Sequence, residues 1–541
     1  MKHLISIILI LSIVTIKSQT FEWGETFDSK TTIEKIIGTD GGLVYAHSSR
    51  MKKNYIDTYD KNLNLTKSRL ITLKKKSVVV DVFMANGELN ILNYIHDKEE
   101  DEIRLYANFA DKNGITKNDD KLIMIIPLES SRMNGKFSFE FSPDKSKILF
   151  HHEVLLSKIG VTQLTIKMVD NQFNELVSNK KTFKTENKKR VKTSFEFAVN
   201  NQGGYYLLSG INSTRNGKIN SQTYNLFCYD KTGSETKKKE ISFENKYIAN
   251  SKLKITEDGK TLICGGVYME IPANRKGKSY SVDHLNGVWS HAMNTADNSI
   301  LFSTTNDFDT EFYREYYSEK KFNRKKDKEE GLNISSASTP VIKNIIAHSK
   351  GFYIVSEQFS NSLDDFPGAA SYQLTHGHIF VTSISEAGTL NWHNSVFKNQ
   401  IYNESRNTGF GAVGLRVRSA NGRTDPFFIT DGYTSKEVQE KTKFYSFLTT
   451  TKDDDLKILY LDTYRNDGIT NSDDISTMRN YRKGIPYVVT ISQGGDLNKK
   501  GLAKDKDEVF IAPKMYFVND KKEFIIYGEK RKDKKLSYFS F

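Results

Sequence analysis

Residues 139–152 read FEFSPDKSKILFHH, two short apolar stretches separated by a Ser-Pro-Asp-Lys turn. Apolar alternation on both sides of a tight turn is typical of a β-hairpin. The same unit returns along the chain, with Asp, Asn or Gly in the turn, at 36–48, 82–95, 195–210, 253–266, 344–358, 447–462 and 515–529. The sequence therefore predicts a series of eight similar hairpins.

A second unit follows most of these hairpins and reads as a third strand, a turn and a fourth strand. Its copies lie at 55–71, 164–183, 224–243, 287–305, 378–397 and 487–502. The two units together make an antiparallel sheet of about 50–60 residues, which cannot bury its own faces unless neighbouring copies stack on it. We therefore predict an all-β fold, a single β-propeller of four-stranded blades. The count favours eight blades, with seven as the alternative.

The two ends of the chain indicate how the ring closes. The last hairpin is followed by one further strand, KLSYFSF (535–541), which lacks a partner. The segment FEWGETF (21–27) resembles the fourth strand LNWHNSV (390–396), with Trp23 in the place of Trp392. We expect the N-terminal strand to complete the C-terminal blade, because closure removes exposed sheet edges.

Two segments do not fit the repeat. Residues 309–332 are densely charged and lack turn residues before Gly331, which predicts an exposed helix or a flexible excursion. Residues 408–441 are interpreted as an inserted hairpin or an extra blade.

The N-terminus has the features of an export signal. Lys2 and His3 precede a predominantly apolar run of 13 residues, Leu4–Ile16, followed by polar KSQT. A spanning helix needs about 20 residues, so the run has the length of a signal-peptide core. We predict a signal peptide over 1–18 and a propeller domain over 19–541. No later stretch is apolar enough to cross a membrane, so the mature protein is expected in the periplasm, at the cell surface or outside the cell.

The repeat motif is similar to those of known propellers. FEFSPDKSKILF resembles the repeats of TolB-like and WD-type propellers, whose turn is Ser-Pro-Asp-Gly, although Lys145 stands where that Gly is usual. The passage IVSEQ…HIFVTSISEAGTLNW (354–392), with the charged insert and the export signal, resembles a family of exported bacterial propellers without assigned activity. The resemblance implies a fold and a compartment, and it supplies no functional residues.

The charge balance is basic, with 79 Lys and Arg against 66 Asp and Glu. These charges are scattered over runs such as 73–77, 236–240 and 530–535, whereas a nucleic-acid binder concentrates them in one stripe. We expect solvated loops here and no nucleic-acid partner. An anionic polysaccharide or another acidic envelope surface is the alternative.

Two motifs invite an assignment as a cofactor or catalytic site. GFGAVG (409–414) has the glycine spacing of a dinucleotide fingerprint, but LRVRSANGR reads as a strand where that fingerprint needs a helix. A loop is therefore predicted. The Gly-x-Ser-x-Gly elbow of α/β-hydrolases and the Asp-box of sialidases are both missing from the chain.

Histidines and acidic loops are the candidate metal ligands. His376 and His378 would share one face of a strand, with His393 as the only third partner that can be named, and zinc needs three or four ligands. The adjacent His151 and His152 would point to opposite faces. The loops NGITKNDD (113–120) and NDGITNSDD (466–474) lack EF-hand spacing and are interpreted as acidic turns, with loop-bound calcium as the alternative.

Cys228 and Cys264 lie in strand-like apolar runs. They are interpreted as buried small hydrophobic residues, and a disulfide is the alternative that export would permit.

No catalytic, cofactor-binding or metal-binding residue is assigned from the sequence, and no cofactor is expected. The hypothesis is a secreted or periplasmic non-enzymatic propeller that binds a protein or envelope component. The alternative is an exported hydrolase or lyase acting on a glycan or peptide, whose paired carboxylates only the fold could bring together.

Overall fold

The computed structural model describes residues 21–541 with gaps. The gaps are 29, 86, 98, 118, 128–134, 157–159, 185–190, 216–217, 272–283, 328–331, 333, 336–339, 367–368, 408–441, 504–508, 520 and 532. The predicted signal peptide (1–18), the segment 408–441 and the GFGAVG motif within it therefore lie outside the described residues.

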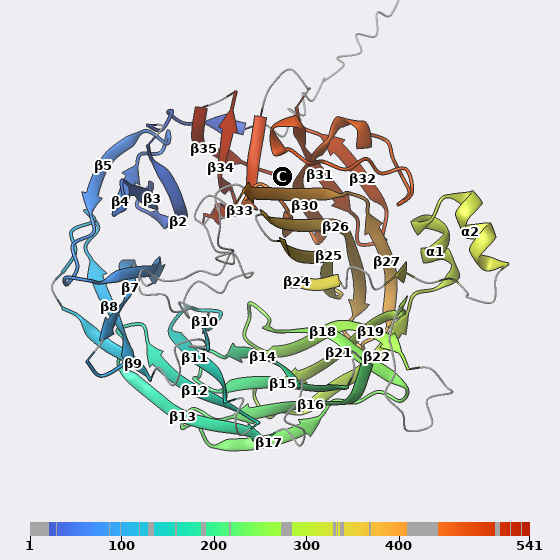
Figure 1. Cartoon of the computed structure of the whole chain (residues 1–541), viewed down its shortest axis with the longest axis horizontal. Coiled ribbons are helices and arrows are strands. Elements are labelled where there is room, and N and C mark those ends of the chain that lie inside the picture. The colour runs from blue at the N-terminus through green and yellow to red at the C-terminus, as the bar shows by residue number, and fades with distance from the viewer. Residues whose placement is uncertain are drawn as a thin grey trace, which may run out of the picture.

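Eight four-stranded antiparallel sheets form a closed ring (Figure 1). The prediction of an all-β propeller is confirmed, with eight blades and not seven. In blades 1 to 7 the four strands follow one another in chain order, and the first strand lies nearest the centre, as Figure 1 shows for β10, β14, β18 and β24.

The first four blades use sixteen consecutive strands. Blade 1 contains β2 (Thr32–Asp40), β3 (Leu43–Arg50), β4 (Lys53–Tyr59) and β5 (Leu65–Leu70). Blade 2 contains β6 (Val78–Ala85), β7 (Glu88–Asp97), β8 (Glu102–Ala110) and β9 (Lys121–Pro127). Blade 3 contains β10 (Lys136–Phe141), β11 (Lys147–Leu156), β12 (Val161–Asp170) and β13 (Glu175–Lys184). Blade 4 contains β14 (Val191–Val199), β15 (Tyr205–Arg215), β16 (Lys218–Tyr229) and β17 (Glu235–Glu240).

The later blades carry additions to the repeat. Blade 5 contains β18 (Lys246–Ile255), β19 (Thr261–Glu270), β21 (Gly287–Asn294) and β22 (Ile300–Asp307), and beside it β20 (His284–Leu285) pairs with β23 (Ile334–Ser335). Blade 6 contains β24 (Pro340–His348), β25 (Gly351–Phe366), β26 (Ala369–Ser385) and β27 (Leu390–Val396), and β28 (Gln400–Asn407) pairs with the first half of β26. Blade 7 contains β29 (Phe447–Lys452), β30 (Asp455–Thr463), β31 (Gly484–Ile491) and β32 (Leu497–Gly501), with short 3-10 helices at Tyr464–Asn466 and Tyr481–Lys483. Blade 8 contains β33 (Val509–Val518), β34 (Phe524–Lys530), β35 (Asp533–Phe539) and β1 (Phe21–Trp23).

The ring closes through β1, as the sequence predicted. Phe21 pairs with Phe539 and Trp23 with Ser537, so the N-terminal strand is the outer strand of blade 8. The parallel with blade 6 extends to the partner residue, because Trp392 pairs with Ser383. The backbone N–H of Phe27 continues the contact by donating to the carbonyl of Lys534 at 2.9 Å.

The turns between the third and fourth strands share one capping interaction. In blades 1 to 4 an Asp side chain caps the turn by accepting backbone N–H groups two and four residues on, at 2.8–3.0 Å. The capping residues are Asp60, Asp111, Asp170 and Asp230. The residue three places after each Asp has a positive φ, which turns the chain back into the fourth strand.

The turn that joins the first and second strands of a blade has its fourth residue in a left-handed backbone conformation. Lys145 in blade 3 has φ +57° and Gly259 in blade 5 has φ +76°. A side chain in this conformation costs about 1–2 kcal/mol, and Gly avoids that cost. We expect Lys145→Gly to raise the free energy of unfolding by up to about 1 kcal/mol, and Gly259→Ala to lower it by about the same amount. Urea denaturation measures the free energy of unfolding of both variants, and a change of the same sign in the two would contradict the prediction.

The outer strands carry much of the basic charge. β17 reads ETKKKE, with lysines at positions 237 to 239, and this strand lies at the outer rim of the ring (Figure 1). An outer strand has one unpaired edge, and lysine on such an edge opposes pairing with another chain. Part of the excess of Lys and Arg over acidic residues is thus a property of the fold and does not indicate a ligand.

The charged segment after blade 5 contains two helices, α1 (Thr310–Tyr316) and α2 (Glu319–Lys326), which project from the ring beside blades 5 and 6 (Figure 1). Among the described residues, no helix is both long and apolar enough to cross a membrane.

Candidate functional site

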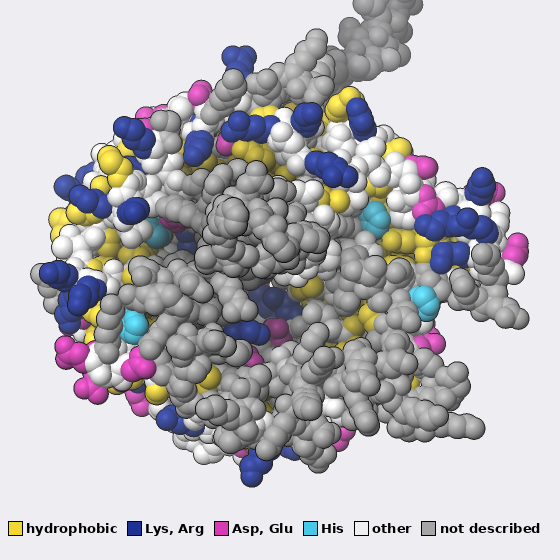
Figure 2. Space-filling model, in the orientation of Figure 1, with side chains coloured by type: hydrophobic (Ala, Val, Ile, Leu, Met, Phe, Trp, Pro, Cys, Tyr) yellow, Lys and Arg dark blue, Asp and Glu magenta, His cyan; other side chains and the backbone are white. Residues whose placement is uncertain are grey.

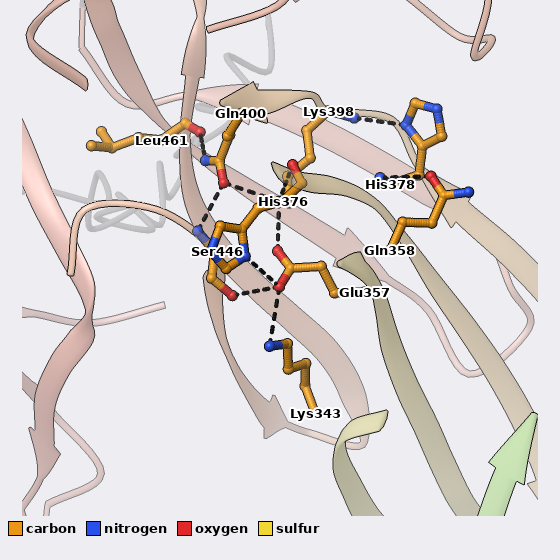
Figure 3. A network of polar contacts seen from close by, with 9 residues as sticks. All are labelled: Lys343, Glu357, Gln358, His376, His378, Lys398, Gln400, Ser446 and Leu461. Atoms are coloured by element: carbon orange, nitrogen blue, oxygen red, sulfur yellow. Dashed lines mark hydrogen bonds and ion pairs between the residues drawn. The ribbon is translucent and has the colours of Figure 1, made fainter. Parts of the chain in front are cut away.

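A buried polar network lies where blade 6 meets blade 7 (Figure 3). Its centre is Glu357 on β25, whose Oε1 lies 2.7 Å from the Nζ of Lys398, in the loop between β27 and β28. The Oε2 lies 2.9 Å from Nδ1 of His376 on β26 and accepts a hydrogen bond of 2.8 Å from the Ser446 hydroxyl. All four side chains are buried, so the network is closed to solvent.

A second layer of contacts ties the network to blade 7. The Lys398 ammonium also donates to Oε1 of Gln400, at 3.0 Å, and the Gln400 amide donates to the carbonyl of Leu461 on β30 at 2.6 Å. Ser446 has φ +81°, an uncommon backbone for a residue with a side chain, and its N–H donates to Gln400 Oε1 at 2.8 Å. The network therefore fixes the entry of the chain into blade 7.

The charged groups in this network stabilise one another in their ionised forms. Burial would raise the pKa of Glu357, but Lys398, His376 and the more distant Lys343 together keep it well below its usual range. Burial lowers the pKa of Lys398, and Glu357 restores it in part. A buried carboxylate and ammonium in contact stay charged because each replaces the water that the other has lost.

The order of the groups is not that of a catalytic triad. In a triad the histidine lies between the nucleophile and the carboxylate and takes the proton of the nucleophile. Here Glu357 lies between Ser446 and His376, so the imidazole does not contact the hydroxyl. Since no substrate can reach these atoms, the network is structural.

The three histidines weighed as metal ligands do not converge. A β-bulge near Glu357 interrupts the alternation of β26, so His376 contacts Glu357 while Nδ1 of His378 accepts from the backbone N–H of Lys398. His393 packs on Phe308 with its ring centroid 4.8 Å away, beside α1. Within the described residues no three His, Cys, Asp or Glu side chains lie close enough to hold a metal ion.

The two acidic loops have other roles in the described part of the chain. Asp111, two residues before the first loop, caps the β8–β9 turn, and Asp120 at the end of that loop pairs with Lys74 at 2.7 Å. β8 and β9 are not among the repeats predicted from the sequence, where this loop is interpreted as an acidic turn. In the second loop, Asp473 binds the start of α2.

The remaining candidates from the sequence are also part of the core. His151 stacks on Phe197 between blades 3 and 4, with ring centroids 4.1 Å apart. Cys228 and Cys264 are free and buried between blades 4 and 5, and burial raises the pKa of Cys228 to about 11, so this thiol stays protonated.

Half-buried histidines make the fold sensitive to acid. Burial lowers the pKa of His378 and of His393 to about 4, from the usual 6.5. Stability from such a group is fully present above pH 6.5 and is lost as the pH falls towards 4, since the unfolded chain binds the proton first. Each of the two therefore lowers stability by about 2 kcal/mol between pH 7 and pH 5.

We expect His393→Gln to weaken the pH dependence of the urea midpoint between pH 7 and pH 5. His284→Gln is the control, because His284 is exposed. A His393 variant that loses as much stability in acid as the parent protein would refute this assignment.

The solvent-accessible group of charges from different blades lies at the centre of the ring. Glu140 on β10, Glu196 on β14, and Lys252 and Lys254 on β18 belong to the inner strands of blades 3, 4 and 5. Glu140 and Lys254 are exposed, and Glu196 and Lys252 are half-buried. Figure 2 shows dark blue and magenta side chains in the central opening. We call these four residues the central charge group.

The two carboxyl groups affect each other across the blades. Burial raises the pKa of Glu196 to about 7, Lys252 opposes this shift and Glu140 adds to it. Glu140 is exposed by surface area, but its position among the inner strands partly desolvates the carboxyl and raises its pKa, against the effect of Lys252 and Lys254. Among the described residues neither carboxylate has a hydrogen bond or a close ion pair. Carboxylates without a close polar partner inside an opening are candidates for contact with a ligand.

A pocket of about 520 Å³ lies between blades 1 and 2, lined by residues that include Tyr45, Lys67 and Lys112. Its charged groups already have partners, because Lys112 pairs with Asp40 at 2.5 Å and Lys67 donates to Asn113 at 2.8 Å. The central charge group is therefore the stronger candidate.

Comparison with known proteins gives structural resemblances only. No protein-family model and no curated protein matches the chain. The polysaccharide lyase Uly1 is 11% identical with a TM-score of 0.35, over 91% of this chain and 94% of its own. The β-propeller domain of the trilobed protease from Pyrococcus furiosus is 10% identical with a TM-score of 0.29, over 66% of this chain and 94% of its own. An α-L-arabinanase of Penicillium chrysogenum is 9% identical with a TM-score of 0.27, over 54% of this chain and 97% of its own. These values decide neither activity nor ligand.

Proposed function

We propose that the protein is an exported, non-enzymatic propeller that binds a protein or another component of the cell envelope. The observation that supports this proposal is the central charge group, in which two glutamates and two lysines from three blades share one opening without pairing closely. A ligand that offers both a cationic and an anionic group would satisfy these side chains. Proteins and many envelope polymers carry such groups.

The site lacks what most covalent chemistry would need. The central charge group holds no serine–histidine or cysteine–histidine pair, and the serine and histidine that do lie near one carboxylate belong to the closed network around Glu357. Propeller loops and channels commonly serve as binding surfaces. A binding role therefore needs no group beyond those present.

A test is capture of envelope components on the immobilised mature protein. The variant Glu140→Gln/Glu196→Gln/Lys252→Gln removes three members of the central charge group. The matched control Glu240→Gln/Glu244→Gln/Lys239→Gln makes the same charge changes at exposed positions outside the opening. We expect the amount of component captured by the central charge group variant to fall by about tenfold or more, and the amount captured by the control to stay unchanged. Equal capture by both variants would place the binding site elsewhere, and capture no higher than on bare resin would reject the binding role.

One observation favours a second candidate, a glycan hydrolase or lyase. A carboxyl with a pKa near 7 can act as a general acid while a neighbouring carboxylate acts as base or nucleophile. Glu196 and Glu140 are the pair that could take these roles. Release of new reducing ends from envelope glycans, abolished in Glu196→Gln while capture persists, would establish the enzyme and overturn the non-enzymatic proposal.

A further inference from the structure

The two helices after blade 5 form an arm that is firmly attached to the ring. We call residues 309–327 the helical arm. Asp309 caps α1 by accepting from the N–H of Phe312 at 2.8 Å. The buried face of α1 packs against the ring through the aromatic side chains of Phe312, Tyr313 and Tyr316. Because this face is fully packed, the arm has a fixed orientation.

A second anchor comes from blade 7. The carboxylate of Asp473 accepts from the N–H of Ser318 at 3.0 Å, from its hydroxyl at 2.7 Å, and from Nζ of Lys321 at 2.5 Å. The N–H of Ser472 donates to the carbonyl of Tyr316 at 2.9 Å. Contacts to two parts of the ring hold the start of α2 in place.

The outward side of α2 is strongly basic. The helix reads EKKFNRKK, five cations and one acid, and Lys320, Arg324 and Lys326 are exposed. None of these three has an acidic partner within 4 Å in the part of the chain that the structure describes. Figure 2 shows their region as a dark blue cluster that extends beyond the rim of the ring.

Ordinary structural roles do not account for the whole cluster. Cations in the last turn stabilise a helix by about 0.3–1 kcal/mol, which covers Arg324 and Lys326. Lys320 lies in the first turn, where the helix dipole disfavours a cation, and Asp473 is occupied by Lys321 instead. Protection of a sheet edge, which explains the lysines of β17, does not apply to a helix.

The helical arm presents positive charge but no exposed aromatic side chain on which a base could stack. Its aromatic residues are all buried, and the ring of Tyr317 lies under Nζ of Lys321 and Lys325, at 4.7 Å and 5.2 Å from its centroid. Proteins that bind single-stranded nucleic acid combine positive charge with aromatic side chains on which bases stack. A linear polymer of simple anionic units needs only the charge, and Lys320 and Arg324 are neighbours on one helix face, four residues apart.

We infer that the helical arm is a docking surface for a linear acidic polysaccharide, bound through Lys320 and Arg324 on one face of α2, with Lys326 adding charge at the exposed end of the helix. This surface is separate from the central opening, so the inference goes beyond the proposed function and stands or falls independently of it. The fixed anchoring of α2 means that no ordering of the arm is needed on binding, which favours affinity.

The experiment measures binding of the mature protein to immobilised polygalacturonate between 50 and 200 mM salt, with the triple variant Lys320→Gln/Arg324→Gln/Lys326→Gln. We expect about a tenfold or greater loss of affinity at low salt and a shallower dependence on salt, because fewer counterions are released. The matched control is Lys53→Gln/Lys61→Gln/Lys231→Gln, which removes the same charge from exposed positions elsewhere on the ring. This control should change affinity less than twofold.

Three outcomes would overturn the inference. Equal losses in both variants would assign binding to net charge alone. Equal or tighter binding of an oligonucleotide or of polyglutamate would assign the arm to another class of polyanion. No binding of the parent protein would remove the site altogether. Since all six substituted side chains are exposed, unchanged melting temperatures should show that the variants are folded, and the central-opening variant should bind polygalacturonate as the parent does.

Discussion

Removing residues 21–27 from the chain that lacks the predicted signal peptide should lower the melting temperature by about 10 °C or more. The deletion exposes the edge of β35 and takes away Phe21, which stacks on Phe539 at 5.0 Å, and the buried Phe27. Loss of a large buried aromatic side chain costs about 3–5 kcal/mol, and each broken backbone hydrogen bond adds about 1 kcal/mol. The total is on the order of 10 kcal/mol, because blade 8 loses its outer strand and the seam with blade 1 loses Phe27, which packs between Tyr59 and Tyr527.

Point variants separate the closure contact from the length of the chain. Trp23 packs against Gly528, where an added Cβ would lie 2.9 Å from the indole ring, so Trp23→Ala should give a sizeable part of the loss. The neighbouring Glu22 is exposed, and Glu22→Ala should change the melting temperature by less than about 1 °C. Differential scanning calorimetry measures all three proteins. A deletion variant that melts with the parent protein would show that β1 does not hold the ring closed.

Lys398→Met should lower the free energy of unfolding by about 3–5 kcal/mol. The substitution keeps the length of the side chain and removes the ammonium 2.7 Å from Glu357. The carboxylate then remains buried with its contacts to His376 and Ser446, and its nearest cation is the more distant Lys343 at 3.4 Å. An uncompensated buried charge is far more costly than a missing pair, and this difference is the physical basis of the prediction.

A double-mutant cycle tests this account of the network. Glu357→Gln combined with Lys398→Met leaves no buried charge, so the double variant should be less destabilised than the sum of the single variants, by about 2 kcal/mol. Lys343→Met is the control, since Lys343 is 27% exposed and lies 3.4 Å from the carboxylate, and it should cost less than about 1 kcal/mol. Additive effects in urea denaturation would show that the pair is not coupled.

The repeat was readable from the sequence because strands and turns are local. Alternating apolar residues and turns such as DKNLN (60–64) and DNQFN (170–174) depend on neighbours within a few positions, and the structure contains these turns as Asp-capped loops. The match of Trp23 to Trp392 also predicted ring closure, since both residues occupy the outer strand of a blade. The Asp at the first position of these turns was an available signal for β8–β9 at Asp111, where the repeat was missed.

The grouping of charged side chains could not be read from the chain. Glu357, Lys398 and Ser446 are far apart in the sequence, and no local pattern distinguishes them from other residues in strands and loops. The same is true of Glu140, Glu196 and Lys252, which belong to three successive blades. Even for His376 and His378, the β-bulge at the intervening Gly377 sends the two rings to different partners, and the glycine alone does not identify those partners.

The sequence by itself determined the all-β class, the repeated strand–turn–strand unit and the closing strand, and it favoured eight blades. Hydrogen bonding and apolar burial within a blade follow a short period that is visible in the order of the residues. The tertiary structure alone decided which charges are closed in the seam around Glu357, which lie in the central opening and which project on α2. These outcomes depend on how neighbouring blades pack and on how far each group is removed from water, and both are properties of contacts between residues distant in the chain.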